Sequence, residues 1–129
     1  MVNQSFLRTR DNGFTLIELL VVLAIVALLL TLASPRYFQS IETSKETVLL
    51  HNLHSTRETI SHFYSDTGKY PETLEELVEK KYLHSIPIDP ISELPWKIIP
   101  PEEEDKGKVF DVKSSSPGVA KNGIPFSEL

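Results

Sequence analysis

The sequence has no cysteine among its 129 residues, and this absence excludes a disulfide framework and thiol chemistry. Basic residues are also too few to balance the acidic ones, since 13 Lys and Arg against 18 Asp and Glu give a net charge of −5 at pH 7. Because duplex DNA is normally bound by a basic surface, nucleic acid is not expected to be the main partner.

The usual patterns of an enzyme are absent as well. The sequence contains no nucleophile–base–acid arrangement and no glycine-rich phosphate loop. Glu72, Glu75 and Glu76 could be taken for an acid/base pair, but acidic residues are also typical of the first turn of a helix. We therefore predict that the protein is not an enzyme, with no catalytic residue and no cofactor.

What the sequence does contain is a long apolar segment near its start. Of the 20 residues from 14 to 33, only Thr15, Glu18 and Thr31 are not apolar, and no glycine or proline follows before Pro35. About 20 apolar residues cross a bilayer as an α-helix. A secretory signal peptide fits less well, because its apolar core is usually about 7–15 residues long.

The flanks of this segment predict its orientation. Arg8 and Arg10 precede it, whereas Arg36 and a largely acidic region follow. Basic residues beside a membrane helix tend to stay in the cytoplasm, so residues 36–129 should lie outside the membrane. Within the segment Glu18 is ionisable, and since a carboxylate in hydrocarbon is costly, it is expected to have a cationic partner.

The apolar segment begins with Gly13-Phe14-Thr15-Leu16-Ile17-Glu18. This motif closely resembles the processing site of type IV pilins and type II secretion pseudopilins, in which a prepilin peptidase removes a short leader after a glycine. The resemblance implies leader cleavage between Gly13 and Phe14, N-methylation of Phe14, and an assembly role for Glu18, the fifth residue after cleavage. Pro35 matches the helix-kinking proline that the family commonly has, and assembly is expected to depend on it as well.

The resemblance also implies the partners and the location of the protein. The partners are copies of this chain and other pseudopilins in a helical filament, the prepilin peptidase/N-methyltransferase and an inner-membrane assembly platform. The protein would cross the bacterial inner membrane once, with its leader in the cytoplasm, and would form a periplasmic pseudopilus when assembled. In such a filament Glu18 of one helix could lie beside the N-terminal amine of a neighbour. Many type IV pilins close their C-terminal region with a disulfide, so the lack of cysteine favours a pseudopilin.

The expected fold class is α+β, a type IV pilin-like fold with a long N-terminal helix and a small head that holds a short helix and a short antiparallel sheet. The expected parts are a leader at 1–13, a transmembrane and assembly helix at 14–34, an amphipathic continuation at 35–65 and a periplasmic head at 66–129. Pro35 should bend or locally melt the helix. Apolar residues recur at helical spacing in the continuation, namely Ile41, Leu49, Leu53, Ile60 and Phe63 or Tyr64.

Within the head, residues 73–83 predict a second helix. Two short runs at 96–99 and 108–112 predict an antiparallel hairpin. The polar loop between them, residues 100–107, contains four acidic residues and is interpreted as a solvated turn. A last turn is expected at 121–123.

Two segments of the head resemble the major pseudopilin of type II secretion more narrowly, namely Gly68-Lys69-Tyr70-Pro71 and Ile86-Pro87-Ile88-Asp89-Pro90. The next six residues, 91–96, depart from the family's Trp-Gly-x-Pro-Tyr pattern. That family is known for a calcium site in its last loop, and calcium takes six to eight oxygen ligands. Residues 114–127 contain no Asp or Glu, so we predict no metal site there.

A second candidate for metal binding lies on the long helix. His54, Glu58 and His62 are four residues apart and share one face of a helix. This face points away from the apolar one, and a fourth ligand is not identifiable, so we interpret it as the solvated side of an amphipathic helix.

The sequence therefore predicts a structural subunit of a pseudopilus that drives protein export. The alternative is a minor type IV pilin for adhesion, motility or DNA uptake. A third hypothesis, from a different class, is a membrane-anchored binding module that is never assembled and that retains residues 1–13.

Overall fold

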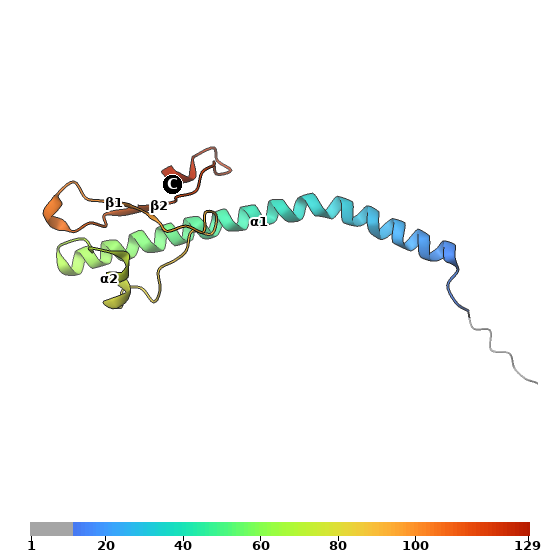
Figure 1. The fold of residues 1–129 in the computed structure, drawn as a ribbon, viewed down its shortest axis with the longest axis horizontal. Helices are drawn as coiled ribbons and strands as arrows, with labels where there is room; N and C mark the ends of the chain where they lie inside the picture. Colours follow the sequence, from blue (N-terminus) through green and yellow to red (C-terminus); the bar gives the residue numbers. More distant parts are fainter. Residues whose placement is uncertain (1–11) are drawn as a thin grey trace, which may run out of the picture. The chain divides into compact units, whose positions relative to one another are not determined.

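The computed structural model describes residues 12–129, which fall into two compact units divided between Phe38 and Gln39. Most of the predicted leader lies outside the described residues. Within these described residues there are two α-helices and two strands (Figure 1): α1 Leu16–Thr67, α2 Leu74–Glu79, β1 Lys97–Ile99 and β2 Asp111–Lys113. Short 3-10 turns occur at Glu104–Lys106 and Phe126–Glu128. This architecture confirms the predicted α+β fold class.

The N-terminal unit holds the apolar part of α1. Every described residue of this unit is exposed within the chain, and the helix is long and apolar enough to cross a membrane by length and composition. α1 runs through Pro35 without a break, so the local melting that was one of the two expectations for Pro35 does not occur in this structure.

The C-terminal unit is built on the amphipathic part of α1. The buried residues of this helix are Leu49, Leu53, Thr56, Ile60 and Phe63. Ile41, the first residue of the predicted apolar series, lies in α1 but is 37% exposed. The series did not include Thr56, whose hydroxyl is satisfied because it donates to the carbonyl of Asn52 at 2.7 Å.

α1 ends at Thr67, two residues later than predicted. Gly68 follows with φ +75° and donates its N–H to the carbonyl of Tyr64 at 2.8 Å. A glycine in this left-handed conformation is a common helix C-cap. Tyr64 itself is half-buried and stacks on Tyr70 with ring centroids 4.5 Å apart.

α2 is shorter than the predicted helix at 73–83. Thr73 is its N-cap and accepts from the N–H of Glu76, while Lys81 takes φ +64° and stops the helix. The N–H groups of Tyr82 and Leu83 both donate to the carbonyl of Leu77, which turns the chain back. Figure 1 shows α2 and the hairpin on different sides of α1.

β1 and β2 form the predicted antiparallel hairpin, with Ile98 opposite Val112. The second strand starts three residues later than predicted, at Asp111. The reason is that Lys108 and Val109 donate their N–H groups to the carbonyl of Pro71 instead of to β1. The predicted turn at 121–123 is present, with Gly123 N–H bonded to the carbonyl of Ala120 at 2.9 Å.

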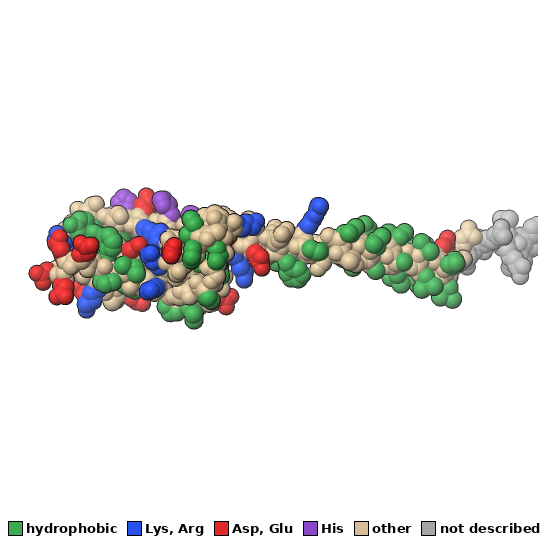
Figure 2. Space-filling view, turned by 90° about the horizontal axis from the view of Figure 1, so that it is seen from above, with side chains coloured by type: hydrophobic (Ala, Val, Ile, Leu, Met, Phe, Trp, Pro, Cys, Tyr) green, Lys and Arg blue, Asp and Glu red, His purple; other side chains and the backbone are tan. Residues whose placement is uncertain are grey.

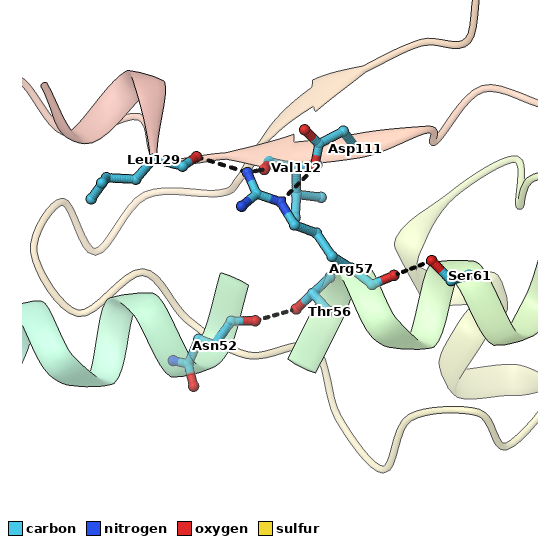
Figure 3. A network of polar contacts seen from close by, with 7 residues as sticks. All are labelled: Asn52, Thr56, Arg57, Ser61, Asp111, Val112 and Leu129. Carbon is cyan, nitrogen blue, oxygen red and sulfur yellow. Dashed lines mark hydrogen bonds and ion pairs between the residues drawn. The ribbon is translucent and has the colours of Figure 1, made fainter. Parts of the chain in front are cut away.

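One core fills the C-terminal unit. Its buried side chains come from α1, α2 and the hairpin region: Leu49, Leu53, Ile60, Phe63, Leu74, Leu77, Trp96, Val109 and Val112. Arg57 joins α1 to the edge of this core (Figure 3). Its guanidinium donates to Asp111 at 2.7 Å and to the carbonyls of Val112 and Leu129 at 3.0 and 2.7 Å.

Candidate functional site

The predicted cleavage site lies just before α1. Residues 12–15 are not helical, and Phe14 is 91% exposed. A Cβ atom built on Gly13 would meet nothing within 4 Å. The peptide bond after Gly13 therefore lies in open, irregular backbone, which is the kind of segment that a protease can take up in an extended conformation.

Glu18 and Thr15 together cap the start of α1. The Glu18 carboxylate accepts hydrogen bonds from the Thr15 N–H at 2.9 Å and from the Thr15 hydroxyl at 3.2 Å. The Glu18 N–H donates back to the Thr15 hydroxyl at 3.3 Å. This reciprocal arrangement is a capping box, which satisfies N–H groups that a helix start leaves without partners.

The capping box was missed in the sequence, although its signal is there. A Thr followed three residues later by Glu, directly before an apolar run, is the sequence pattern of a capping box. From the sequence we expected only a cationic partner for Glu18. The structure instead supplies a local partner within the same subunit, and the negative charge also lies at the helix N-terminus, where the helix dipole favours it.

Comparison with known protein families gives a match to the prokaryotic N-terminal methylation motif at residues 8–34. The chain is 30% identical over 99 residues to the type II secretion system core protein G of Pseudomonas aeruginosa, and this match covers 64% of the chain and 70% of that protein. The chain belongs to the type IV pilin-like family. Its motif and its long N-terminal helix agree with the family that the sequence predicted.

This pilin-like chain is also similar to pilus proteins. It is 31% identical over 85 residues to the fimbrial protein EcpC of Eikenella corrodens, of which it covers 56%. It is 35% identical over 68 residues to the type IV major pilin protein PilE1 of Neisseria gonorrhoeae, of which it covers 40%. The chain thus spans little more than half of the fimbrial protein and less than half of this pilin. No solved structure matches the chain significantly.

The names of these relatives describe secretion and pilus proteins rather than enzymes. The acidic residues around the start of α2 in the pilin-like chain have a structural explanation. Glu76 accepts from Lys80 at 2.7 Å and from the Glu72 N–H at 2.7 Å, and these two bonds hold the pKa of Glu76 below its ordinary value. A carboxylate kept ionised in this way supports the helix start.

Three of the four histidines of the pilin-like chain, His51, His54 and His62, lie on the exposed side of α1. Figure 2 shows histidine side chains gathered along one side of the C-terminal unit. His54, Glu58 and His62 are all exposed, and His62 Nε2 lies 3.9 Å from a Glu58 oxygen. No group of three or more metal-ligating side chains occurs within residues 12–129.

Asp89, in the segment that resembles the major pseudopilin, is fully buried. One carboxylate oxygen accepts from the N–H groups of Ile91 and Ser92 at 2.9 and 3.1 Å, and the other accepts from the Ser114 hydroxyl. Burial by itself raises the pKa of Asp89, but the hydrogen bonds outweigh it and the pKa is lowered. Asp89 therefore ties the loop at 89–92 to the chain after β2.

The segment at 91–96, which departs from the family pattern, ends in a buried tryptophan. Trp96 is 6% exposed, and its indole N–H donates to the carbonyl of Pro87 at 2.6 Å. The loop between them is thus closed by Trp96 at one end and by Asp89 inside it.

Proposed function

We propose that this chain is a structural pseudopilin subunit of a type II secretion system, which assembles through its N-terminal helix into a periplasmic pseudopilus. The observation that carries the proposal is the extent of the match to the core protein G. The chain covers 70% of that protein, against 56% of the fimbrial protein and 40% of the PilE1 pilin. A small, cysteine-free head fits the same assignment.

The proposal gives each part of the chain a role. Residues 1–13 act as a cytoplasmic leader, and cleavage after Gly13 gives a mature chain that begins with N-methylated Phe14. Residues 14–34 anchor the subunit in the inner membrane and later pack in the filament, and the head at 66–129 lies in the periplasm. Copies of the chain, other pseudopilins, the prepilin peptidase/N-methyltransferase and an inner-membrane assembly platform are its partners.

Glu18 is proposed to act in assembly through its charge. Cleavage creates a free amine on Phe14, and the carboxylate of Glu18 in a neighbouring copy can pair with it. Since breaking a buried ion pair leaves one charge uncompensated, this pairing would select the register between copies more than it would add stability. Pro35 lacks an N–H group, so the helix around it is the part of α1 most easily deformed on packing.

A minor type IV pilin is the second candidate. The similarity to the fimbrial protein EcpC and to the PilE1 pilin favours it. Such a subunit would act in adhesion, motility or DNA uptake rather than in export.

Deletion of the gene separates the two functions. Loss of a pseudopilin leaves secreted enzymes in the periplasm and surface fibres unchanged, whereas loss of a pilin leaves export intact and alters fibres or twitching. A deletion that changes neither would contradict both proposals.

The mass and N-terminal sequence of the chain from membranes, with and without a prepilin peptidase, test the processing. We expect a chain that starts at methylated Phe14 only when the peptidase is present. A chain that still starts at Met1, or one cut near Ser34, would show an ordinary anchor or signal and would rule out the filament.

A further inference from the structure

An open apolar groove lies in the C-terminal unit, between the start of α2 and β1. Its volume is about 650 Å³. Apolar side chains line the groove, among them Ile88 at 68% exposure, Leu94 at 56% and Ile98 at 39%. Their exposure to water does not stabilise the monomer. Neighbouring exposed apolar residues of this kind mark interaction surfaces.

The rim of the groove is acidic. Glu72, Glu75 and Glu93 border it, and the single cation there, Lys108, is already 3.4 Å from Glu72. The rim therefore keeps a negative charge and favours a partner that is both apolar and basic.

Backbone strain is present at the same rim. Glu93 has φ +56°, a left-handed conformation that costs a residue with a side chain about 1–2 kcal/mol. Such strained residues cluster at ligand clamps. The strain turns the chain between Ser92 and Leu94, where the groove wall is formed.

The chain itself contains a segment with the complementary chemistry. Arg36, Tyr37 and Phe38 follow the apolar span, and all three are exposed, Tyr37 at 65% and Phe38 at 63%. Arg36 takes part in no ion pair within residues 12–129. One cation beside two aromatic rings matches an apolar groove with an acidic rim.

We infer that the groove binds the Arg36–Phe38 segment of a second copy of this chain. The aromatic rings would cover Ile88, Leu94 and Ile98, and Arg36 would face Glu75 and Glu93. The two surfaces differ, so the contact is head-to-tail, and repetition of such a contact gives an open helical assembly when its rotation does not close into a ring. The inference rests on the proposed filament and names one contact that holds it together.

Cross-linking in cells tests this contact, because the chain has no cysteine of its own. Two differently tagged full-length copies are expressed together in a host with a prepilin peptidase, one with Phe38→Cys and the other with Leu94→Cys. The control pairs Phe38→Cys with Val119→Cys, since Val119 is 57% exposed but does not line the groove. A disulfide-linked pair of the two tags is expected for 38–94 and not for 38–119.

Charge reversal provides the second arm. Glu75→Lys on the groove copy should abolish the 38–94 cross-link, and Arg36→Glu on the other copy should restore it. Both residues are exposed, so the fold should tolerate these changes. If the Leu94→Cys chain does not accumulate, Ile88→Cys takes its place.

The outcomes separate this contact from the proposed function. Processing at Gly13 and release of secreted enzymes are measured in the same strains. Normal processing and release without a 38–94 cross-link, or with equal 38–94 and 38–119 cross-links, would overturn the contact and leave the proposed function standing. Unprocessed chains in the wild type would instead contradict the proposed function, and the contact with it.

Discussion

Arg57 and Asp111 lie 54 residues apart in the chain, yet Arg57 Nε and an Asp111 carboxylate oxygen meet at 2.7 Å. The same guanidinium also donates to the carbonyls of Val112 and Leu129. A single side chain of α1 thus holds both β2 and the segment at the end of the described chain against the helix.

Arg57→Ala is expected to lower the free energy of unfolding by about 2 kcal/mol, since three hydrogen bonds to a partly exposed charged group are lost. Urea denaturation of the full chain in detergent micelles measures this change. Lys45→Ala, which removes an exposed cation of the same helix, is the matched control and should change it by less than about 0.5 kcal/mol. Equal effects of the two substitutions would show that Arg57 does not clamp the fold.

Asp89 gives stability a pH dependence. Because its pKa is lowered in the folded chain, the stabilisation is fully present above the ordinary aspartate pKa and is lost as the pH falls through the folded value. Asp89→Asn should be less stable at neutral pH and should lose less further stability on acidification below about pH 4. Thermal melts across about pH 2–7, a range that brackets the titration of Asp89, measure both effects. If the stability of the wild type and of Asp89→Asn falls in parallel with pH, Asp89 is not the source of the pH dependence.

Glu18 has two roles that one pair of variants separates. Glu18→Gln keeps an oxygen that can cap α1 but removes the charge, whereas Glu18→Leu removes both. If the charge serves assembly, both variants should be processed after Gly13 and neither should form filaments, as shown by N-terminal mass and electron microscopy of sheared fractions. Filaments of Glu18→Gln at wild-type levels would show that capping alone matters.

Gly107 lies where no side chain fits. Its φ is +94°, and a Cβ atom there would lie 2.7 Å from the carbonyl carbon of Tyr70. Gly107→Ala should therefore cost at least about 2 kcal/mol more than Gly123→Ala, which has a similar φ of +85° but nothing within 4 Å of its Cβ. Comparison of the unfolding free energies of the two variants tests the close contact between Gly107 and Tyr70. If both variants lose the same stability, the positive φ alone would explain the loss.

Calcium removal is expected to have no effect on the fold. Residues 114–127 contain no carboxylate, and the nearby Asp89 carboxylate is already bonded to Ser114 and to two N–H groups. EDTA should leave Tm unchanged, and added calcium should not raise it. A rise in Tm with calcium would show a site that the described contacts do not account for.

The parts of the fold that local chemistry controls could be predicted well. The long helix follows from an uninterrupted apolar run and from helical spacing, and α2 follows from Thr73 and the acidic residues after it. The boundaries were less accurate, because Gly68, Lys81 and the contacts of Lys108 with Pro71 decide where elements stop. The exposure of Ile41 shows the same limit, since helical spacing cannot tell where along α1 the packed region begins.

By itself, the sequence determined the apolar span, the processing motif and therefore the family, since each depends on residues within a few positions of one another. Only the tertiary structure decided that Arg57 clamps β2, that Asp89 is buried against Ser114, and that Ile88, Leu94 and Ile98 border one acidic groove. These features join residues that are distant in the chain, and their energies depend on burial and geometry that no local pattern contains.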